Sequence, residues 1–441
     1  MIEKIFDRRE TDMLKKFTLK NGLRIVYEKI PYVNSITIGI WVGSGSRLEE
    51  TYNNGVSHFI EHMMFKGTLN RTSQQIAEEI EELGGQINAF TGKEATCYYV
   101  KLLDEHYATG INVLSDMLLN PKFAVDDIEK EKGVIIEEIN MYEDSPEDLV
   151  FDLLSIATWK EDTLALPILG YETTIKNLNR DMIVDYYSKT YVPSNIVISL
   201  AGNFDEEKIL ELIKERFENW NPPKNVQIEY SLPLINKGMA IKHKDIEQVH
   251  VAVTLNGIEL GSDKLYTLLA INNYFGGGTS SRLFQKLREE FGFVYSIYSY
   301  TSAYKNKGMF NIQFALNKAY LEKSMHLITE EIVNLLKNKM NDTQISKAKE
   351  QLKGSYILGL ESVSSRMFGI GKSELMLNKV YEPKEILKKI DSITRQEFDE
   401  VIEHVFKEGF MAVAMVGKDI KEEKIKKIIG DCNETIYKAI R

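Results

Sequence analysis

Residues 22–45 read GLRIVYEKIPYVNSITIGIWVGSG, and residues 238–260 read GMAIKHKDIEQVHVAVTLNGIEL. Each stretch contains two runs in which apolar residues alternate with other residues, and a short turn joins the runs. Such alternation is typical of β-strands, and the short turn favours a β-hairpin. Because the pattern occurs twice in one chain, we expect an internal repeat.

The similarity between the two halves continues downstream of these stretches. A helical pattern, GVSHFIEHMMFKG at 55–67, corresponds to residues 266–289, and both are followed by strand-like, tyrosine-rich sequence and two amphipathic helices. Residues 195–217 and 410–430 each contain a buried strand, a glycine turn and a helix that opens with acidic residues. Corresponding points lie about 210 to 216 residues apart. The sequence therefore predicts two homologous α+β lobes.

The predicted lobes comprise residues 1–225 and 237–441, and a linker at 226–236 joins them. Pro233 and the pair Pro222–Pro223 mark this region as extended rather than helical. A length of 441 residues is about three times that of a usual domain, which agrees with a division into two. Helices and strands do not alternate strictly, so we expect a mainly antiparallel sheet in each lobe, with helices packed on one face.

The composition describes an ordinary globular protein, with 43% hydrophobic and 27% charged residues. A net charge of -10 gives no footprint for nucleic acid or an anionic membrane surface. Cys97 and Cys432 lack metal-type spacing, and the charged N-terminus lacks the apolar core of a signal peptide. No apolar run of about 18 residues occurs. We expect a cytoplasmic protein with neither a nucleic-acid nor a membrane partner.

His58 and His62 are four residues apart within the apolar helical pattern. On a helix this spacing places both imidazoles on one face, as two ligands of one zinc ion require. Glu61 lies between them and can reach a water on the metal without being a ligand itself. H-x-x-E-H is the inverted form of the H-E-x-x-H motif of zinc peptidases. The motif predicts that Glu61 activates a zinc-bound water, which attacks a peptide bond.

A catalytic zinc ion takes three protein ligands and leaves a fourth position for water, so one more ligand is needed. The segment EKEKGVIIEEINMYED at 129–144 holds the candidates. Glu131 and Glu138 are seven residues apart and share a helix face, whereas Glu137 points roughly 100° away. We expect Glu138 to be the third ligand and Glu131 to orient the site as a supporting or substrate-side carboxylate. The expected content is one Zn²⁺ per chain.

A solvated helix surface is the competing interpretation of the histidine pair. The surrounding sequence FIEHMMF, residues 59–65, is too apolar for an exposed face. Two histidines and a glutamate buried there without a metal would be costly, since buried polar groups need partners. The pattern therefore favours a metal site.

These segments resemble the pitrilysin and insulinase family of inverted-motif zinc peptidases, in particular the mitochondrial processing peptidase branch and its short bacterial relatives. HFIEHMMFKGT at 58–68 is similar to the family's metal helix, and EKGVIIEEINMYEDSPED at 131–148 to the segment with the distal glutamate. The resemblance covers nearly the whole chain. It implies Glu138 at the ligand position, Glu131 at the supporting position and Glu61 as general base.

The same resemblance extends to the motif NAFT, which comprises Asn88, Ala89, Phe90 and Thr91. In the family this motif lies on an edge strand to which the substrate backbone is added as a further strand. Without the resemblance, Asn88 would read as a turn residue and Phe90 as plain core.

LREEFGFVYS, residues 287–296, is similar to a family segment that supplies an arginine and a tyrosine near the scissile carbonyl. The corresponding residues are Arg288 and Tyr295. Taken alone, Arg288 would read as a solvated helix charge and Tyr295 as a packed strand aromatic.

The resemblance implies an endopeptidase that hydrolyses peptides or unfolded polypeptide segments. Short members of the family complete their site by dimerisation. Because this chain carries both the metal motif and the arginine–tyrosine pair, we expect a homodimer whose lobes enclose a chamber.

Three alternatives stay open at this point. The chain could be a non-proteolytic core subunit of the same fold, a protease that processes presequences specifically, or one half of a heteromer with an inactive paralogue. In structural subunits the metal motif is typically degraded, and the presence of His58, Glu61, His62 and Glu138 disfavours that alternative.

Overall fold

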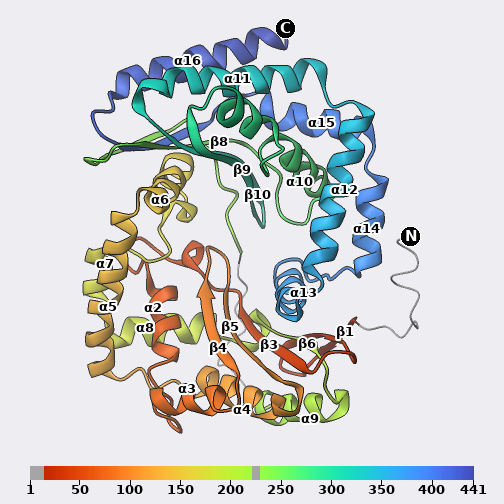
Figure 1. Cartoon of the computed structure of the whole chain (residues 1–441). Helices are drawn as coiled ribbons and strands as arrows, with labels where there is room; N and C mark the ends of the chain where they lie inside the picture. Colours follow the sequence, from red (N-terminus) through yellow and green to blue (C-terminus); the bar gives the residue numbers. More distant parts are fainter. Residues whose placement is uncertain (1–13, 221–228) are drawn as a thin grey trace. The chain divides into compact units, whose positions relative to one another are not determined.

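The computed structural model describes residues 14–220 and 229–441 (Figure 1). Pro222, Pro223 and residues 226–228 of the predicted linker lie outside the described residues. Residues 229–236 form neither helix nor strand.

The described chain forms two compact units, and each is assembled from separate stretches of sequence. The first unit contains the described residues up to 137, 168–229 and 358–382. The second unit contains 138–167, 230–357 and the described residues from 383 onward.

The first unit contains a six-stranded mixed sheet in the order β1-β2-β6-β3-β5-β4. Its strands are β1 (Leu14–Thr18), β2 (Arg24–Lys29), β3 (Ser35–Val42), β4 (Gln86–Thr91), β5 (Thr96–Leu103) and β6 (Ile196–Gly202). The β2–β6 pair is parallel and the other neighbouring pairs are antiparallel. Within the described residues β4 pairs with β5 alone, so β4 is an edge strand.

The second unit contains a five-stranded sheet in the order β7-β11-β8-β10-β9. Its strands are β7 (Met239–His243), β8 (Val249–Asn256), β9 (Val294–Tyr304), β10 (Lys307–Leu316) and β11 (Ala412–Gly417). This order repeats β2-β6-β3-β5-β4 strand by strand, including one parallel pair, here β7–β11. The predicted α+β class with two homologous, mainly antiparallel sheets is confirmed.

The two predicted hairpins are wrong, because their strands do not pair with each other. β6 lies between β2 and β3, and β11 lies between β7 and β8. A short turn keeps two strands close in the chain, but it does not prevent a third strand from pairing between them. The inserted strands come from the end of each repeat, where no local pattern reveals their position.

Helices cover both faces of the first sheet, whereas the sequence predicted helices on one face only. The helices of this unit are α2 (Val56–Met64), α3 (Ser73–Glu81), α4 (Tyr107–Leu119), most of α5 (Val125–Asp144), α7 (Glu172–Asn177), α8 (Arg180–Thr190), α9 (Glu206–Phe217) and α13 (Val363–Leu377). Alternate residues of β3 face opposite helices: Ile38 lies against Gly110 of α4, whereas the hydroxyl of Thr37 lies 3.1 Å from that of Ser364 in α13. Nearly all of β3 is consequently buried.

The second sheet is covered in the same manner. The helices of this unit are α6 (Pro146–Trp159), α10 (Lys264–Phe275), α11 (Leu321–Asn338), most of α12 (Asp342–Gly359), α14 (Pro383–Ser392), α15 (Arg395–Phe406) and α16 (Glu422–Ala439), with the π-helix η5 (Phe284–Glu290). Phe310 and Phe314 of β10 belong to the large apolar core of this unit. The opposite face packs on α6, where Ala252 and Ala414 contact the cluster of Leu149 and Leu154.

The placement of helices α6 and α13 differs from the predicted linear division into lobes of residues 1–225 and 237–441. α6 packs on the sheet of the second unit and α13 on that of the first, so each unit receives one helix from the other half of the chain. Hydrophobic periodicity shows which face of a helix is buried, not which sheet buries it. The division of labour between a metal-binding lobe and a substrate-contact lobe stays a prediction.

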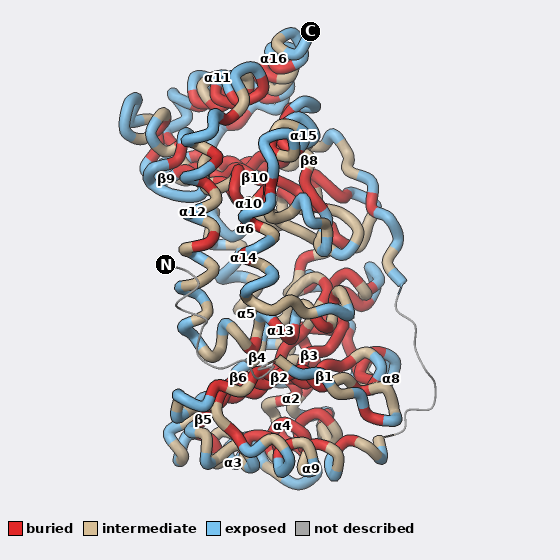
Figure 2. The backbone as a smooth tube through the Cα atoms, turned by 90° about the vertical axis from the view of Figure 1, so that its right-hand side faces the viewer, coloured by how far each residue is buried: buried red, intermediate tan, exposed pale blue. Residues whose placement is uncertain are grey.

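Burial follows this layered arrangement, and Figure 2 shows the strands of each sheet as the most continuously buried parts of the chain. Cys97 and Cys432 are both buried and free. In the part of the chain that the structure describes, no helix is both long and apolar enough to cross a membrane.

Candidate active site

Helix α2, which carries the H-x-x-E-H motif, begins at a tightly built turn. Gly55 precedes it with a φ of 95°, and a side chain there would meet the Leu169 carbonyl and the Gly170 Cα at 2.8 and 2.9 Å. The buried carboxylate of Glu49 accepts hydrogen bonds from the backbone N–H groups of Gly55 and Ser57, at 2.7 and 2.8 Å. A carboxylate at this position satisfies helix N–H groups that have no partner within the helix. The start of the motif helix is thereby fixed.

Three potential metal ligands meet beside this helix. One ligand atom from each of His58, His62 and Glu138 lies within 4.8 Å of the others, and the two imidazole rings are 4.5 Å apart between centroids. His58 is buried, while His62 and Glu138 are half-buried. Two imidazole nitrogens and a carboxylate oxygen are the donor set of a catalytic His₂Glu zinc site, which leaves a fourth position open. These residues fit a zinc ion, whereas the neighbouring Glu137 is exposed.

The protonation state of His58 suits a metal ligand. Burial and the nearby His62 lower the pKa of His58 to about 3, although the carboxylate of Glu131 acts in the opposite direction. The imidazole is therefore neutral at neutral pH. A neutral imidazole has the free lone pair that metal binding requires.

Glu131 lies next to the metal ligands and contacts one of them. Its side chain is buried, with Oε1 2.8 Å from Nδ1 of His62 and Oε2 2.6 Å from Nζ of Lys66. Burial raises the pKa of Glu131, but the bonds to His62 and Lys66 outweigh burial and hold it below its usual value. An ionised carboxylate only accepts, so Nδ1 of His62 donates and Nε2 is the ring nitrogen left for a metal. The contact orients His62 as a ligand.

Glu61 contacts the end of the edge strand. The hydroxyl of Thr91, the last residue of β4, donates to Oε2 of Glu61 at 2.5 Å and lies 3.3 Å from the hydroxyl of Thr96. This contact joins the motif helix to the strand that the resemblance implicates in substrate binding. Glu61 is half-buried, between its two histidine neighbours in the motif.

The residues of NAFT all lie on the edge strand β4. Asn88 and Phe90 are exposed, while Ala89 and Thr91 are half-buried. The ring of Phe90 packs edge-on against Trp41, with 5.6 Å between centroids. Among the described residues no strand pairs with the outer edge of β4, so a further extended segment can add there.

Arg288 and Tyr295 lie together in the second unit. Arg288 is in η5, and Tyr295, the second residue of β9, is 79% exposed. The guanidinium carbon of Arg288 is 5.7 Å from the centroid of the Tyr295 ring. The prediction of a packed strand aromatic, made without the resemblance, does not hold for so exposed a side chain.

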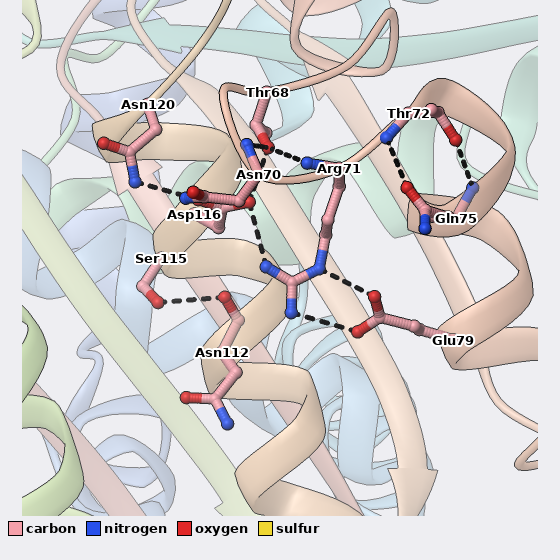
Figure 3. A network of polar contacts seen from close by, with 10 residues as sticks. All are labelled: Thr68, Asn70, Arg71, Thr72, Gln75, Glu79, Asn112, Ser115, Asp116 and Asn120. Atoms are coloured by element: carbon pink, nitrogen blue, oxygen red, sulfur yellow. Dashed lines mark hydrogen bonds and ion pairs between the residues drawn. The ribbon is translucent and has the colours of Figure 1, made fainter.

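A polar network fixes the loop that follows the motif helix, and Figure 3 shows it. At its centre the carboxylate of Asp116 in α4 accepts from Thr68 and Asn70 at 2.5 Å and from Arg71 at 2.9 Å. Arg71 also forms a two-bond ion pair with Glu79 of α3, at 2.9 and 3.0 Å. Burial raises the pKa of Asp116, yet these hydrogen bonds together hold it below its usual value. The network ties the loop to two neighbouring helices.

Neither Lys66 nor Asp116 was predicted from the sequence to lie at the site. Lys66 looks like any surface lysine, and its partner Glu131 is distant along the chain. Asp116 sits in a helix with no motif around it. The contact of Thr91 with Glu61 was equally unexpected, because it joins a strand to a helix.

Comparisons with known proteins agree with this geometry. The family model described as "Insulinase (Peptidase family M16)" matches residues 24–172, and that described as "Peptidase M16 inactive domain" matches residues 177–352. A Bacillus subtilis protein named as the uncharacterized zinc protease YmxG is 40% identical over 404 residues, which cover 92% of this chain and 98% of that protein. The chain belongs to peptidase family M16.

Other M16 relatives match over most of their length. A Streptomyces coelicolor protein, also named as an uncharacterized zinc protease, is 35% identical over 388 residues, covering 86% of this M16 peptidase and 84% of that protein. Among solved structures, a protease from Helicobacter pylori has a TM-score of 0.85 at 21% identity, with 92% of this chain and 99% of that chain covered.

A further solved structure shares the fold. A chain of complex III2 from Candida albicans has a TM-score of 0.81 at 18% identity, covering 96% of this M16 peptidase and 99% of that chain. At these identities both solved structures show a common fold and no more.

Proposed function

We propose that this M16 peptidase is a zinc-dependent endopeptidase with one Zn²⁺ per chain. The observation that carries the proposal is the meeting of His58 and His62 of α2 with Glu138 of α5 within 4.8 Å. Helix α2 also presents Glu61. His58, His62 and Glu138 would hold the metal. Bound zinc supplies a Lewis acid that polarises a carbonyl and acidifies a water.

Glu61 is proposed as the general base. Its carboxylate takes a proton from the attacking water and passes it to the amine that leaves when the peptide bond breaks. The hydroxyl of Thr91 donates a hydrogen bond to one oxygen of that carboxylate and so orients it. Glu131 acts through His62, by keeping the Nδ1 proton in place.

The proposed substrates are peptides or unfolded polypeptide segments. Residues 88–91 form an exposed sheet edge, to which an extended chain can add through backbone hydrogen bonds whatever its side chains. Arg288 and Tyr295 are proposed as further substrate contacts, and Tyr295 has the exposure that this role needs. A hydroxyl and a guanidinium can both stabilise an oxyanion.

The protein is further proposed to act as a homodimer in the cytoplasm. One chain carries both the metal motif and the arginine–tyrosine pair, so two copies suffice for activity. Size-exclusion chromatography with activity assayed on the dimer peak tests this point. Activity that appears only when a different protein is added would support a heteromer instead.

A non-proteolytic core subunit of the same fold is the alternative. The intact ligand cluster disfavours it, because a structural subunit has no need for two histidines and a glutamate at this spacing. Specific processing of presequences, as opposed to general peptide hydrolysis, is a question of substrate. A cleavage assay on a mixed peptide library distinguishes the two.

A matched pair of variants tests the metal assignment. Glu138→Gln removes a proposed ligand, whereas Glu137→Gln changes the exposed neighbour on the same helix. We expect the purified wild type and Glu137→Gln to hold one zinc per chain and to cleave a quenched peptide. Glu138→Gln should lose both properties. Equal zinc content in the two variants would exclude Glu138 as a ligand.

A further inference from the structure

Lys66 stands one turn beyond His62, directly after the motif helix. Phe65 donates its N–H to the His62 carbonyl and Lys66 donates to that of Met63, both at 3.1 Å, so the helical path continues past Met64. The side chains of Lys66 and His62 reach the same acceptor.

That acceptor is the carboxylate of Glu131. One oxygen, Oε1, lies 2.8 Å from Nδ1 of His62, and the other, Oε2, lies 2.6 Å from Nζ of Lys66. Each oxygen thus has one partner, and the carboxylate bridges the imidazole and the ammonium group.

The burial of Glu131 makes the bridge sensitive to the loss of Lys66. The Glu131 side chain is 4% exposed, whereas that of Lys66 is 35% exposed. A buried carboxylate that loses its cationic partner pays a large desolvation penalty and tends to reorient. Such a change disturbs the hydrogen bond to His62.

We propose that Lys66 is a positioning residue for the zinc site. Its ammonium group fixes the Glu131 carboxylate, and the carboxylate fixes the Nδ1–H of His62. Nε2 of His62 would then bind the metal. The inference rests on the proposed zinc site and adds a residue to it. It assigns to Lys66 a share of the zinc affinity, although Lys66 is not a ligand.

The test measures zinc affinity by competition with a chelator. Lys66→Met keeps the length of the side chain and removes its charge, while Lys66→Arg keeps the charge. Partners that orient metal ligands typically account for about 10- to 100-fold in metal affinity, and we expect Lys66→Met to weaken zinc binding by that factor. Lys66→Arg should stay within about threefold of the wild type, since it retains a donor cation.

Lys132 supplies the matched control. It follows Glu131 in α5 and pairs at 2.8 Å with Glu129, a side chain that is 62% exposed. Lys132→Met removes the same charge from the same neighbourhood without touching the bridge. Its zinc affinity should equal that of the wild type.

A double-mutant comparison separates positioning from general destabilisation. In a Glu131→Gln background Lys66→Met should cause no further loss of zinc affinity, because the bridge is already absent. The double variant has no buried unpartnered carboxylate. Its zinc affinity can therefore be compared with that of Glu131→Gln even if Lys66→Met alone does not fold.

The outcomes are distinct. If the wild type binds no zinc, the proposed function and this inference both fail. If the wild type binds zinc but Lys66→Met binds it equally well, only the inference fails. A further loss in the double variant, equal to that of the single variant, would also overturn it.

Discussion

Replacing Thr91 by valine removes one hydroxyl and preserves the shape of the side chain. The backbone pairing of Thr91 with Thr96 in the β4–β5 ladder does not depend on that hydroxyl. What the variant loses is the hydrogen bond from Oγ1 to Oε2 of Glu61, which measures 2.5 Å. The substitution therefore tests the placement of the proposed general base with little effect on the edge strand.

The expected magnitude follows from the charge of the acceptor. Hydrogen bonds to charged groups contribute about 1.5–3 kcal/mol, and roughly 1.36 kcal/mol corresponds to a tenfold change in rate. The whole bond would thus account for about 10- to 150-fold in kcat. Glu61 is only half-buried, so water can replace part of the interaction, and we expect the lower part of that range.

The assay follows cleavage of an internally quenched peptide by the wild type, Thr91→Val and Thr91→Ser. Thr91→Val should lower kcat with an unchanged KM and full zinc content. Thr91→Ser restores the hydroxyl and should recover most of the rate. Wild-type kcat in Thr91→Val would refute the placement of Glu61 by Thr91, and so would an equal loss in both variants.

Two further predictions concern stability. Because burial lowers the pKa of His58 to about 3 from 6.5, the unfolded chain binds a proton that the folded chain does not, so the zinc-free protein should lose stability as the pH falls from 6.5 towards 3. The free energy of unfolding, measured by urea denaturation across that pH range, should fall less steeply with pH in His58→Gln than in the wild type. Identical slopes in the two proteins would contradict the lowered pKa of His58. Asp116→Ala leaves Arg71 and Thr68 without their buried acceptor and should lower the free energy of unfolding by about 2–4 kcal/mol. Glu79→Ala removes a more exposed partner of Arg71 and should lower the free energy of unfolding by about 1 kcal/mol or less. Equal losses in the two variants would show that Asp116 contributes no more to stability than Glu79 does.

The motif helix was predictable because its signal is local. The spacing of His58 and His62 fixes a shared helix face, and the seven-residue spacing of Glu131 and Glu138 does the same on α5. The repeat was predictable for a related reason, since two similar sequences fold into similar units. Here β2-β6-β3-β5-β4 reappears as β7-β11-β8-β10-β9.

What the sequence did not reveal depends on contacts between distant segments. β6 and β11 insert into pairs that looked like hairpins, and α6 and α13 pack on sheets of the other repeat. The bridge from Lys66 through Glu131 to His62 joins two helices, and Thr91 reaches Glu61 from a strand. Hydrophobic periodicity describes one element at a time and carries no information on such pairs.

The most direct test of the account is the comparison of wild type with Glu61→Gln, with zinc content and peptide cleavage measured on the same preparations. The amide keeps the size of the side chain and can still accept from Thr91, but it cannot take a proton from water. We predict one zinc per chain in both proteins and turnover in the wild type alone. Turnover that survives in Glu61→Gln, or a wild type that neither binds zinc nor cleaves any peptide, would contradict the account.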